Sequence, residues 1–415
     1  MSSLLEAIAS YPYEGLTREL LSLGMSWAVM NAGTLEPSAE ELADSLEGAL
    51  RSLGDRTKAH TSKMGRNDRS SFDKVLRVWF NRSAPETYGE LFELVVTETV
   101  KLLRNGLLDP SVSLTSVRVD KNGTYLGVEF DGQTSRRPGK KPKAEYYAIL
   151  PAIIKQPEYY ERQSGFLVPT TGQKAQIRLD PLWFSFVALG FFTSFGGFVG
   201  GRYYLITKLG IEGFWPYEVE DIVVYGLLPI TEAGIHGRLS LSTEELYEMK
   251  LAMKLAEENR DVPGEVYPVV LHVISLEGQV YTELKTVQLD ISSLSRYLNS
   301  YMERIKALSA GGIPLTVELK EGNAKVPKYP LWALVDVAEK ELKKGLNGDG
   351  EMLAYIFVKD LYRAINSGDK RLVEDSVFRL FRQGRALLEG NARVIGELRK
   401  VLKAIMWKDH LEVLL

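Results

Sequence analysis

Apolar residues in the first hundred positions recur every three or four residues, the spacing of a helix with one buried face. Ser38 and Glu41 form a capping box at the start of one such run, which continues to Leu53. A second run predicts a basic amphipathic helix with buried positions at Phe72, Val75, Leu76 and Trp79. A third predicted helix covers Leu91 to Leu103 and ends at the Asn-Gly pair 105–106.

Alternation of apolar and polar residues then predicts strands. Leu114 to Phe130 has the pattern of a hairpin around Asn122-Gly123, because that dipeptide suits a tight turn. A second hairpin is predicted from the alternating runs Val266 to Leu276 and Val280 to Leu289. We expect Pro314 to Lys320 to be the last strand.

The most apolar stretch, Leu182 to Val199, has about the length of a membrane span. Gly190, Gly196 and Gly197 interrupt it and no basic flank accompanies it, so we predict a buried helix instead. The start of the chain lacks the basic region and cleavage site of a signal peptide. We therefore expect a cytoplasmic protein that contacts no membrane.

Beyond Pro327 and Pro330 the pattern becomes helical throughout. Four helices with short connections are predicted, at Leu331 to Leu342, Leu353 to Ile365, Leu372 to Leu388 and Val394 to Trp407. The expected fold class is α+β: a mixed α/β body with antiparallel β-hairpins over residues 1–326, followed by a C-terminal helical bundle over residues 327–415.

The inventory of chemically active residues is small. The 415 residues include no cysteine and only four histidines, which stand alone, so disulfides, thiolate metal sites and cysteine nucleophiles are excluded. No phosphate-binding loop and no G-x-S-x-G motif is present. We expect His272, which alternates with apolar neighbours, to be a strand-face residue, and we expect no enzyme activity, cofactor or metal. The absence of cysteine from a Lys/Glu-rich chain also fits a thermophile.

Positive charge is strongly segregated along the chain. The segments Arg51 to Arg82, Arg136 to Lys143 and Lys370 to Lys408 together hold 24 basic against 7 acidic side chains, a net of +17. The remainder holds 27 basic against 47 acidic side chains, a net of −20. Such separation is typical of a protein with a polyanionic partner, although solvated helix faces also carry charge clusters.

The second basic segment lies in a predicted irregular loop, residues 132–143, because Pro138, Gly139 and Pro142 oppose regular structure. Lysine and arginine neutralise phosphates and release counterions, so this loop is a candidate nucleic-acid contact. A merely solvated loop is the alternative. The candidate residues are Arg136, Arg137, Lys140, Lys141 and Lys143.

The third basic segment places its charges along two predicted helices. Arg379, Arg382 and Arg385 step along one side of the first helix, and Arg399 and Lys403 continue the pattern in the second. Two adjacent basic helix faces would form a groove for a nucleic-acid strand. An ordinary charged surface is the alternative.

The stretch from Gly196 to Tyr204 combines paired glycines with aromatic residues. Glycine pairs allow close packing or a helix-ending turn, and they equally allow a backbone to approach nucleic acid. In the second case Arg202 would bind a phosphate, and Tyr203 or Tyr204 would stack on a base.

Together the α/β body, the Arg136-Arg137-Pro-Gly-Lys140-Lys141 loop, the glycine/aromatic stretch at 190–204 and the basic C-terminal helices resemble the large subunit of an archaeal type I CRISPR surveillance (Cascade) complex, most similar to subtype I-A. The resemblance implies a non-catalytic subunit that binds target DNA and guide RNA within a complex, recognises a flanking motif, supports strand separation and contacts other effector subunits. It places nuclease activity in a partner.

Two other classes of function stay open at this point. The chain could be a nuclease or other hydrolase whose carboxylates converge only in the folded protein. It could also be a scaffold that binds protein alone, through exposed aromatic residues between Phe191 and Tyr204.

Overall fold

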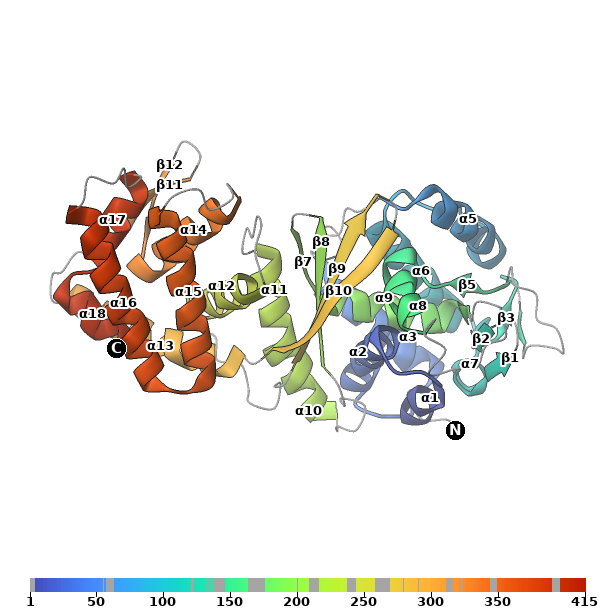
Figure 1. The fold of residues 1–415 in the computed structure, drawn as a ribbon. Coiled ribbons are helices and arrows are strands. Elements are labelled where there is room, and N and C mark those ends of the chain that lie inside the picture. The colour runs from blue at the N-terminus through green and yellow to red at the C-terminus, as the bar shows by residue number, and fades with distance from the viewer. Residues whose placement is uncertain are drawn as a thin grey trace. The chain divides into compact units, whose positions relative to one another are not determined.

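A computed structural model gives the fold of most of the chain (Figure 1). All structural statements below concern the residues it describes. These are residues 4–54, 56, 63–120, 123–132, 134–136, 146–162, 176–199, 201–208, 216–236, 244–257, 269–278, 280–289, 291–310, 316–321, 324–343, 349–389 and 396–415.

The chain divides into two compact units that interleave along the sequence. Unit 1 comprises residues 1–231 and 268–288, and unit 2 comprises residues 232–267 and 289–415. The sequence pattern led us to expect one boundary, between residues 326 and 327. The interleaving arises because the second predicted hairpin pairs with a strand of unit 1, whereas the segments on either side of it pack into unit 2.

Unit 1 is built around two helices in close contact, α2 (Leu16–Ala32) and α9 (Pro181–Ser194) (Figure 1). Every residue of α9 is buried, in agreement with the predicted buried helix. At the crossing, Gly24 faces the carbonyl of Phe186 and Gly190 faces the carbonyl of Leu20. Neither glycine leaves room for a side chain, so these two positions set the distance between the helices.

The other long helices of unit 1 follow the predicted periodicity. In α3 (Ala39–Ser52) both hydrogen bonds of the capping box between Ser38 and Glu41 are formed. The four apolar positions predicted for α5 (Arg66–Phe80) are all buried, and α6 (Tyr88–Arg104) begins at a second capping box. Shorter helices are α1 (Leu4–Ser10), α7 (Pro110–Thr115), α8 (Ala152–Arg162), α10 (Pro216–Glu220) and the π-helix η3 (Asp221–Leu227). The helix α11 (Leu228–His236) begins in unit 1 and ends in unit 2.

The first predicted hairpin is present as β1 (Val117–Asp120) and β2 (Gly123–Leu126), which pair antiparallel. Together with β6 (Ile177–Leu179) and β5 (Ala148–Ile149) they form a sheet of order β1-β2-β6-β5. A separate ribbon joins β3 (Glu129–Phe130) to β4 (Ser135–Arg136). Our prediction of irregular structure across 132–143 is therefore wrong at Ser135 and Arg136, whose backbones pair with β3; residues 137–145 lie outside the described residues.

The second sheet has the order β10-β9-β8-β7, from β7 (Phe195–Val199), β8 (Arg202–Thr207), β9 (Val269–Glu277) and β10 (Val280–Leu289). The predicted second hairpin is confirmed as β9 and β10. The prediction of one helix through to residue 199 is wrong, because the helix ends at Ser194 and Gly197 adopts a φ of 130° in the strand that follows. A register shift between Phe195 and Gly197 accompanies that change.

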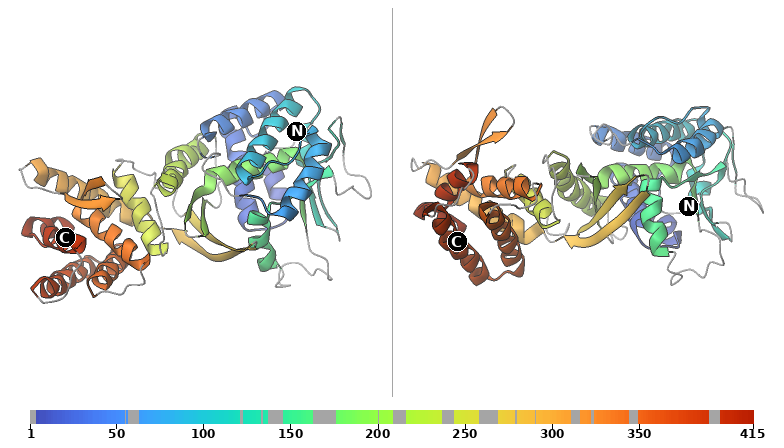
Figure 2. Two further views of the ribbon diagram at one scale, coloured as in Figure 1. Left: turned by 90° about the horizontal axis from the view of Figure 1, so that it is seen from above. Right: turned by 45° about the horizontal axis from the view of Figure 1, so that its top comes forward.

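Unit 2 is mainly helical, as the orange and red elements show in Figures 1 and 2. Its helices are α12 (Glu244–Glu257), α13 (Ile291–Ala310), α14 (Pro330–Lys343), α15 (Asp349–Ser367), α16 (Lys370–Glu389), α17 (Gly396–Ile405) and α18 (Lys408–Leu414). The four predicted C-terminal helices are present as α14 to α17, and the fold class α+β is confirmed.

Two details of unit 2 differ from the prediction. β11 (Val317–Glu321) is followed by a further strand, β12 (Ala324–Lys328), in which Pro327 pairs opposite Glu318. Proline is tolerated there because a two-stranded ribbon leaves one side of each strand unpaired. The chain also ends in α18, a helix beyond the last predicted one. Among the described helices none is long and apolar enough to cross a membrane.

Candidate nucleic-acid interface

Helix α16 carries three of the candidate residues on its exposed side. Its apolar face is buried at Val373, Val377 and Leu380, and Arg379, Arg382 and Arg385 are exposed. Arg379 forms an ion pair with Asp360 of α15 at 2.5 Å, and Arg385 forms one with Glu389 at 2.7 Å. Arg382 has no carboxylate within ion-pair distance among the described residues. Exposed pairs of this kind are weak because water and salt screen them, so a phosphate can replace either carboxylate at little cost.

Helix α17 presents the remaining two C-terminal candidates. Arg399 and Lys403 are exposed, and neither has an ion-pair partner in the described part of the chain. A Cβ on Gly384 of α16 would lie 3.1 Å from Sδ of Met406 and 3.5 Å from Cδ2 of Leu402, so the two helices pack against each other there. The basic helices of the third segment are therefore neighbours in space as well as in sequence.

In the loop between residues 132 and 143, the structure describes one of the five candidates. Arg136 is exposed on β4, where Nε lies 3.7 Å from Oε2 of Glu129 and Nη2 lies 3.9 Å from Oδ2 of Asp131. Arg137, Lys140, Lys141 and Lys143 lie outside the described residues. Arg136 thus stands among acids that are near neighbours in the chain.

Arg202 begins β8, directly after the turn of the β7–β8 hairpin, and is half-buried. The aromatic residues beside it are not placed as predicted. Tyr203 and Tyr204 are each 1 % exposed, and Tyr203 packs against Phe198 with ring centroids 4.5 Å apart. The prediction that either tyrosine stacks on a base is therefore wrong, because successive strand residues point to opposite faces of the sheet and both faces are packed here. Phe191 is also buried, which leaves Phe198, at 49 % exposure, as the exposed aromatic of the surface expected for a protein-binding scaffold.

The first basic segment is mostly engaged within unit 1. Arg69 and Arg77 form exposed ion pairs with Glu86 and Asp73. Arg56, by contrast, is 6 % exposed and donates to four backbone carbonyls: those of Phe192, Thr193, Phe195 and Leu228. Three of these lie at the C-terminal end of α9, where a helix leaves carbonyls unpaired and carries partial negative charge. Arg56 is therefore part of the core.

The candidates fall into separate groups. Arg136 and Arg202 belong to unit 1 but to different sheets, and the five C-terminal residues belong to unit 2. Of the candidates whose positions the structure describes, those on α16 and α17 are the ones brought onto packed neighbouring elements.

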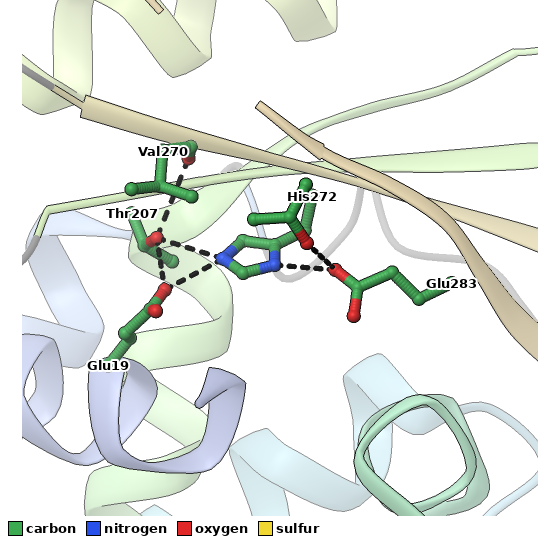
Figure 3. Close-up of polar contacts among 6 residues, drawn as sticks. Glu19, Thr207, Val270, His272 and Glu283 are labelled. Atoms are coloured by element: carbon green, nitrogen blue, oxygen red, sulfur yellow. Dashed lines mark hydrogen bonds and ion pairs between the residues drawn. The ribbon is translucent and has the colours of Figure 1, made fainter. Parts of the chain in front are cut away.

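A buried charged cluster in unit 1 was not predicted. Thr207, His272 and Glu283 lie on the neighbouring strands β8, β9 and β10, and the His272 ring lies between Glu283 on one side and Glu19 of α2 and Thr207 on the other (Figure 3). Nε2 of His272 lies 2.7 Å from Oε2 of Glu19, and Nδ1 lies 2.7 Å from Oε1 of Glu283. Thr207 donates to the same Glu19 oxygen at 2.5 Å.

Both ring nitrogens of His272 face carboxylate oxygens, so both must donate and the imidazole carries a positive charge. Burial by itself lowers the pKa of His272, but the hydrogen bonds to Glu19 and Glu283 outweigh it and raise that pKa to about 9. No nitrogen is left to accept a proton or bind a metal. In this arrangement the His272 side chain links the sheet to α2, and its role is structural.

Unit 2 contains a second internal charge cluster. Lys250 of α12 forms ion pairs with Asp336, at 3.3 Å, and with Glu339 of α14, and Lys328 of β12 also pairs with Asp336. These acids are thus occupied by lysines from neighbouring elements. Among the described residues no group of three or more His, Asp or Glu side chains is arranged to hold a metal ion.

Comparison with known proteins identifies the class of protein. Residues 25–415 match the sequence model of a family of CRISPR-associated proteins, so the chain has a role in CRISPR defence. The family is Cas_Csx9, and because the match spans most of the chain, the chain belongs to it. Searches of the curated proteins and of the solved structures found no match. The resemblance drawn from the sequence is confirmed at the level of a CRISPR-associated protein.

Proposed function

We propose that this protein is the non-catalytic large subunit of a CRISPR interference complex, similar to that of archaeal subtype I-A. It binds target DNA, takes part in recognition of the flanking motif and in strand separation, and contacts guide RNA and neighbouring effector subunits. The observation that carries this proposal is the packing of α16 on α17 at Gly384. It puts on adjacent helices the exposed Arg382, Arg399 and Lys403, which have no ion-pair partner among the residues that the structure describes.

Unpaired cations on adjacent helices suit a phosphate backbone. Each phosphate that a cation neutralises releases condensed counterions, so the affinity rises without any base contact. The negative charge of the remaining chain also favours contact with basic protein subunits and keeps non-specific DNA binding weak elsewhere on the surface.

The internal carboxylates support a non-catalytic assignment. Glu19 and Glu283 are bound to the His272 imidazolium, and Asp336 and Glu339 are bound to Lys250. A catalytic carboxylate needs a free oxygen directed at substrate or metal. We therefore propose that cleavage of the target is performed by a partner.

The salt dependence of DNA binding tests this proposal. The full chain, alone and with its co-purified partners, is titrated with duplex and single-stranded DNA at several salt concentrations. A triple variant, Arg382→Gln, Arg399→Gln and Lys403→Gln, should bind more weakly, and its plot of log affinity against log salt should lose up to about 3 units of slope. The matched control, Arg51→Gln, Arg69→Gln and Arg77→Gln, removes the same charge from α3 and α5 and should bind like the original protein.

Two results would contradict the proposal. One is the absence of DNA binding, or an affinity for DNA that does not depend on salt, for the chain both alone and with its co-purified partners. An affinity for DNA that falls equally in the triple variant and in its control would count in the same way. The other is DNA cleavage by the purified chain alone, abolished by replacing carboxylates of the chain, which would establish the enzyme alternative.

A further inference from the structure

Two aromatic side chains in the C-terminal helices are exposed to solvent to an unusual degree. Of the aromatic residues described in unit 2, Phe378 is 52 % exposed and Trp407 is 51 % exposed, whereas Tyr301 and Trp332 are buried. Exposing so large an apolar surface costs free energy in the isolated chain. A ligand that covers these rings would recover it.

Each exposed ring lies in a run of sequence that contains basic residues and no acid. Phe378 is in the run 376–388, whose charged residues are Arg379, Arg382 and Arg385, and the exposed acids Glu374 and Asp375 directly precede this run. Trp407 is in the run 398–408, whose charged residues are Arg399, Lys400, Lys403 and Lys408. Exposed aromatics and acid-free cationic runs therefore coincide at both places.

The backbone places a cation one turn from each ring. Phe378 and Arg382 are four residues apart within α16, so their Cβ atoms are about 5–6 Å apart on one side of the helix. The helical path of α17 continues past its end, since the N–H of Met406 donates to the carbonyl of Leu402 at 3.0 Å. Lys403 therefore precedes Trp407 by about one turn. The contact of Gly384 with Leu402 and Met406 joins the two helices between these pairs.

We propose that α16 and α17 form a binding site for single-stranded nucleic acid, in which Phe378 and Trp407 stack on unpaired bases while Arg382 and Lys403 bind the adjacent phosphates. This inference rests on the proposed function and specifies, in addition, that the nucleic acid bound at this site is single-stranded. In a duplex the base faces are covered by neighbouring base pairs, so only an unpaired base can offer its face to an exposed ring.

The charge around the rings favours nucleic acid over a protein partner. Aromatic residues and arginine are enriched at protein interfaces, but lysine is depleted there. Trp407 has Lys403 and Lys408 beside it, and the side chain of Lys408 is 85 % exposed, with Nζ 3.8 Å from Oε1 of the exposed Glu412. Stacking platforms flanked by cations are the usual means of binding single strands without sequence preference.

An abasic oligonucleotide separates stacking from phosphate binding. Fluorescence anisotropy of the full chain, alone and with its co-purified partners, compares an oligothymidylate with an abasic oligonucleotide of equal length. Phe378→Ala and Trp407→Ala should each weaken oligothymidylate binding by about 5- to 150-fold, the range for loss of one stacked base, and leave abasic binding unchanged. Phe378→Tyr and Trp407→Phe keep a ring and should retain most of the affinity.

Tyr225 provides a matched control. It is 57 % exposed in η3, but the surrounding sequence from 216 to 236 contains no lysine or arginine, so no cation can bind a phosphate beside it. Tyr225→Ala should therefore leave both affinities unchanged.

Distinct results would overturn this inference and the proposed function. If the original protein binds DNA in a salt-dependent way but does not prefer oligothymidylate to the abasic strand, the stacking site is wrong and the proposed function stands. The same conclusion follows if the alanine variants lose co-purified protein partners and keep their affinity for oligothymidylate. If no preparation binds any nucleic acid, both proposals fail. The comparison of oligothymidylate with the abasic oligonucleotide can be made with the original protein alone, so the test does not depend on how the variants fold.

Discussion

His272 and Glu19 are 253 residues apart in sequence and share a hydrogen bond of 2.7 Å inside unit 1. The imidazolium ring is held on its other side by Glu283, and both of its N–H groups are used. One positive charge is thus shared between two carboxylates in a buried position. The cluster fixes α2 against three strands of the sheet, and its strength must depend on the proton that makes His272 a cation.

Stability should fall at alkaline pH because of this cluster. The pKa of His272 is about 9 in the folded protein and about 6.5 in an unfolded chain. A raised pKa means that the stabilisation is complete below pH 6.5 and is lost as the pH rises through 9. At pH 6 the free energy of unfolding of the original protein should exceed that of the His272→Gln variant by on the order of 3 kcal/mol. This difference should shrink towards pH 10. Urea unfolding of both proteins across this range measures it, and a difference that does not change with pH would contradict a charged His272.

Arg56 should be irreplaceable by lysine. Its Nη2 donates to the carbonyl of Leu228 at 2.9 Å, while Nη1 serves three further carbonyls of unit 1. An ammonium group cannot reproduce this fork, and a buried carbonyl left without a donor costs about 1–3 kcal/mol. Arg56→Lys should lower the free energy of unfolding by about 2 kcal/mol or more. Arg51→Lys, at a side chain that is 79 % exposed, should change it by less than about 0.5 kcal/mol. Equal effects at both sites in chemical denaturation would refute the role of Arg56.

Alanine should not be tolerated where α2 crosses α9. A Cβ on Gly24 would lie 1.9 Å from the carbonyl oxygen of Phe186, and a Cβ on Gly190 would lie 1.9 Å from that of Leu20. Both obstacles are backbone atoms, so the helices must separate, and each substitution should cost about 3 kcal/mol or more. Gly48→Ala is the control, because its Cβ would meet Nδ2 of Asn31 at 3.5 Å. That variant should gain up to about 1 kcal/mol from helix propensity, and thermal unfolding will distinguish the three.

Position 180 should require a carboxylate side chain and not tolerate an amide. The residue is fully buried, which raises the pKa of its carboxyl to about 6 although hydrogen bonds oppose the shift. Oδ1 accepts from the N–H of Trp183, and Oδ2 accepts from Ser113 and from the N–H of Val128. Either orientation of an asparagine would point an NH₂ group at a backbone donor, so Asp180→Asn should cost about 1–3 kcal/mol.

Asp109→Asn is the matched control for that change. Asp109 caps α7 at an exposed position, and one oxygen accepts both hydrogen bonds from Ser111. Asparagine is an equally good cap there, so the midpoint of thermal unfolding should stay within about 1 °C of the original. A similar loss at both positions would show that the cost at Asp180 is not due to the buried donors.

Local elements were predictable where the signal lies within a few residues. The capping box of Ser38 and Glu41 and the buried face of α5 have sequence periods that a helix must satisfy. The hairpin of β9 and β10 could even have indicated part of the buried cluster, since its turn at Gly278 places Glu283 close to the position opposite His272. Nothing in the sequence pairs Glu19 with them.

The end of α9 and the second strand of the β11–β12 ribbon were missed for a different reason. Residues 195–199 are as apolar as the helix before them, so composition could not show where helix gives way to strand. Pairing of β7 with β8 settles that boundary. In β12, Pro327 opposed a strand locally, and pairing with β11 made it acceptable.

The sequence by itself determined the α+β class, most helices, both principal hairpins, the concentration of basic charge in the C-terminal helices and membership of the CRISPR-associated Cas_Csx9 family. The tertiary structure alone decided which charges are buried and which are exposed. Arg56 and Arg382 are both arginines in basic segments, yet one is enclosed by four carbonyls and the other faces solvent. The energy of a charge depends on its distance to other charged and polar groups and on its burial. Packing between segments that are remote in sequence sets both, and the order of residues along the chain does not give them.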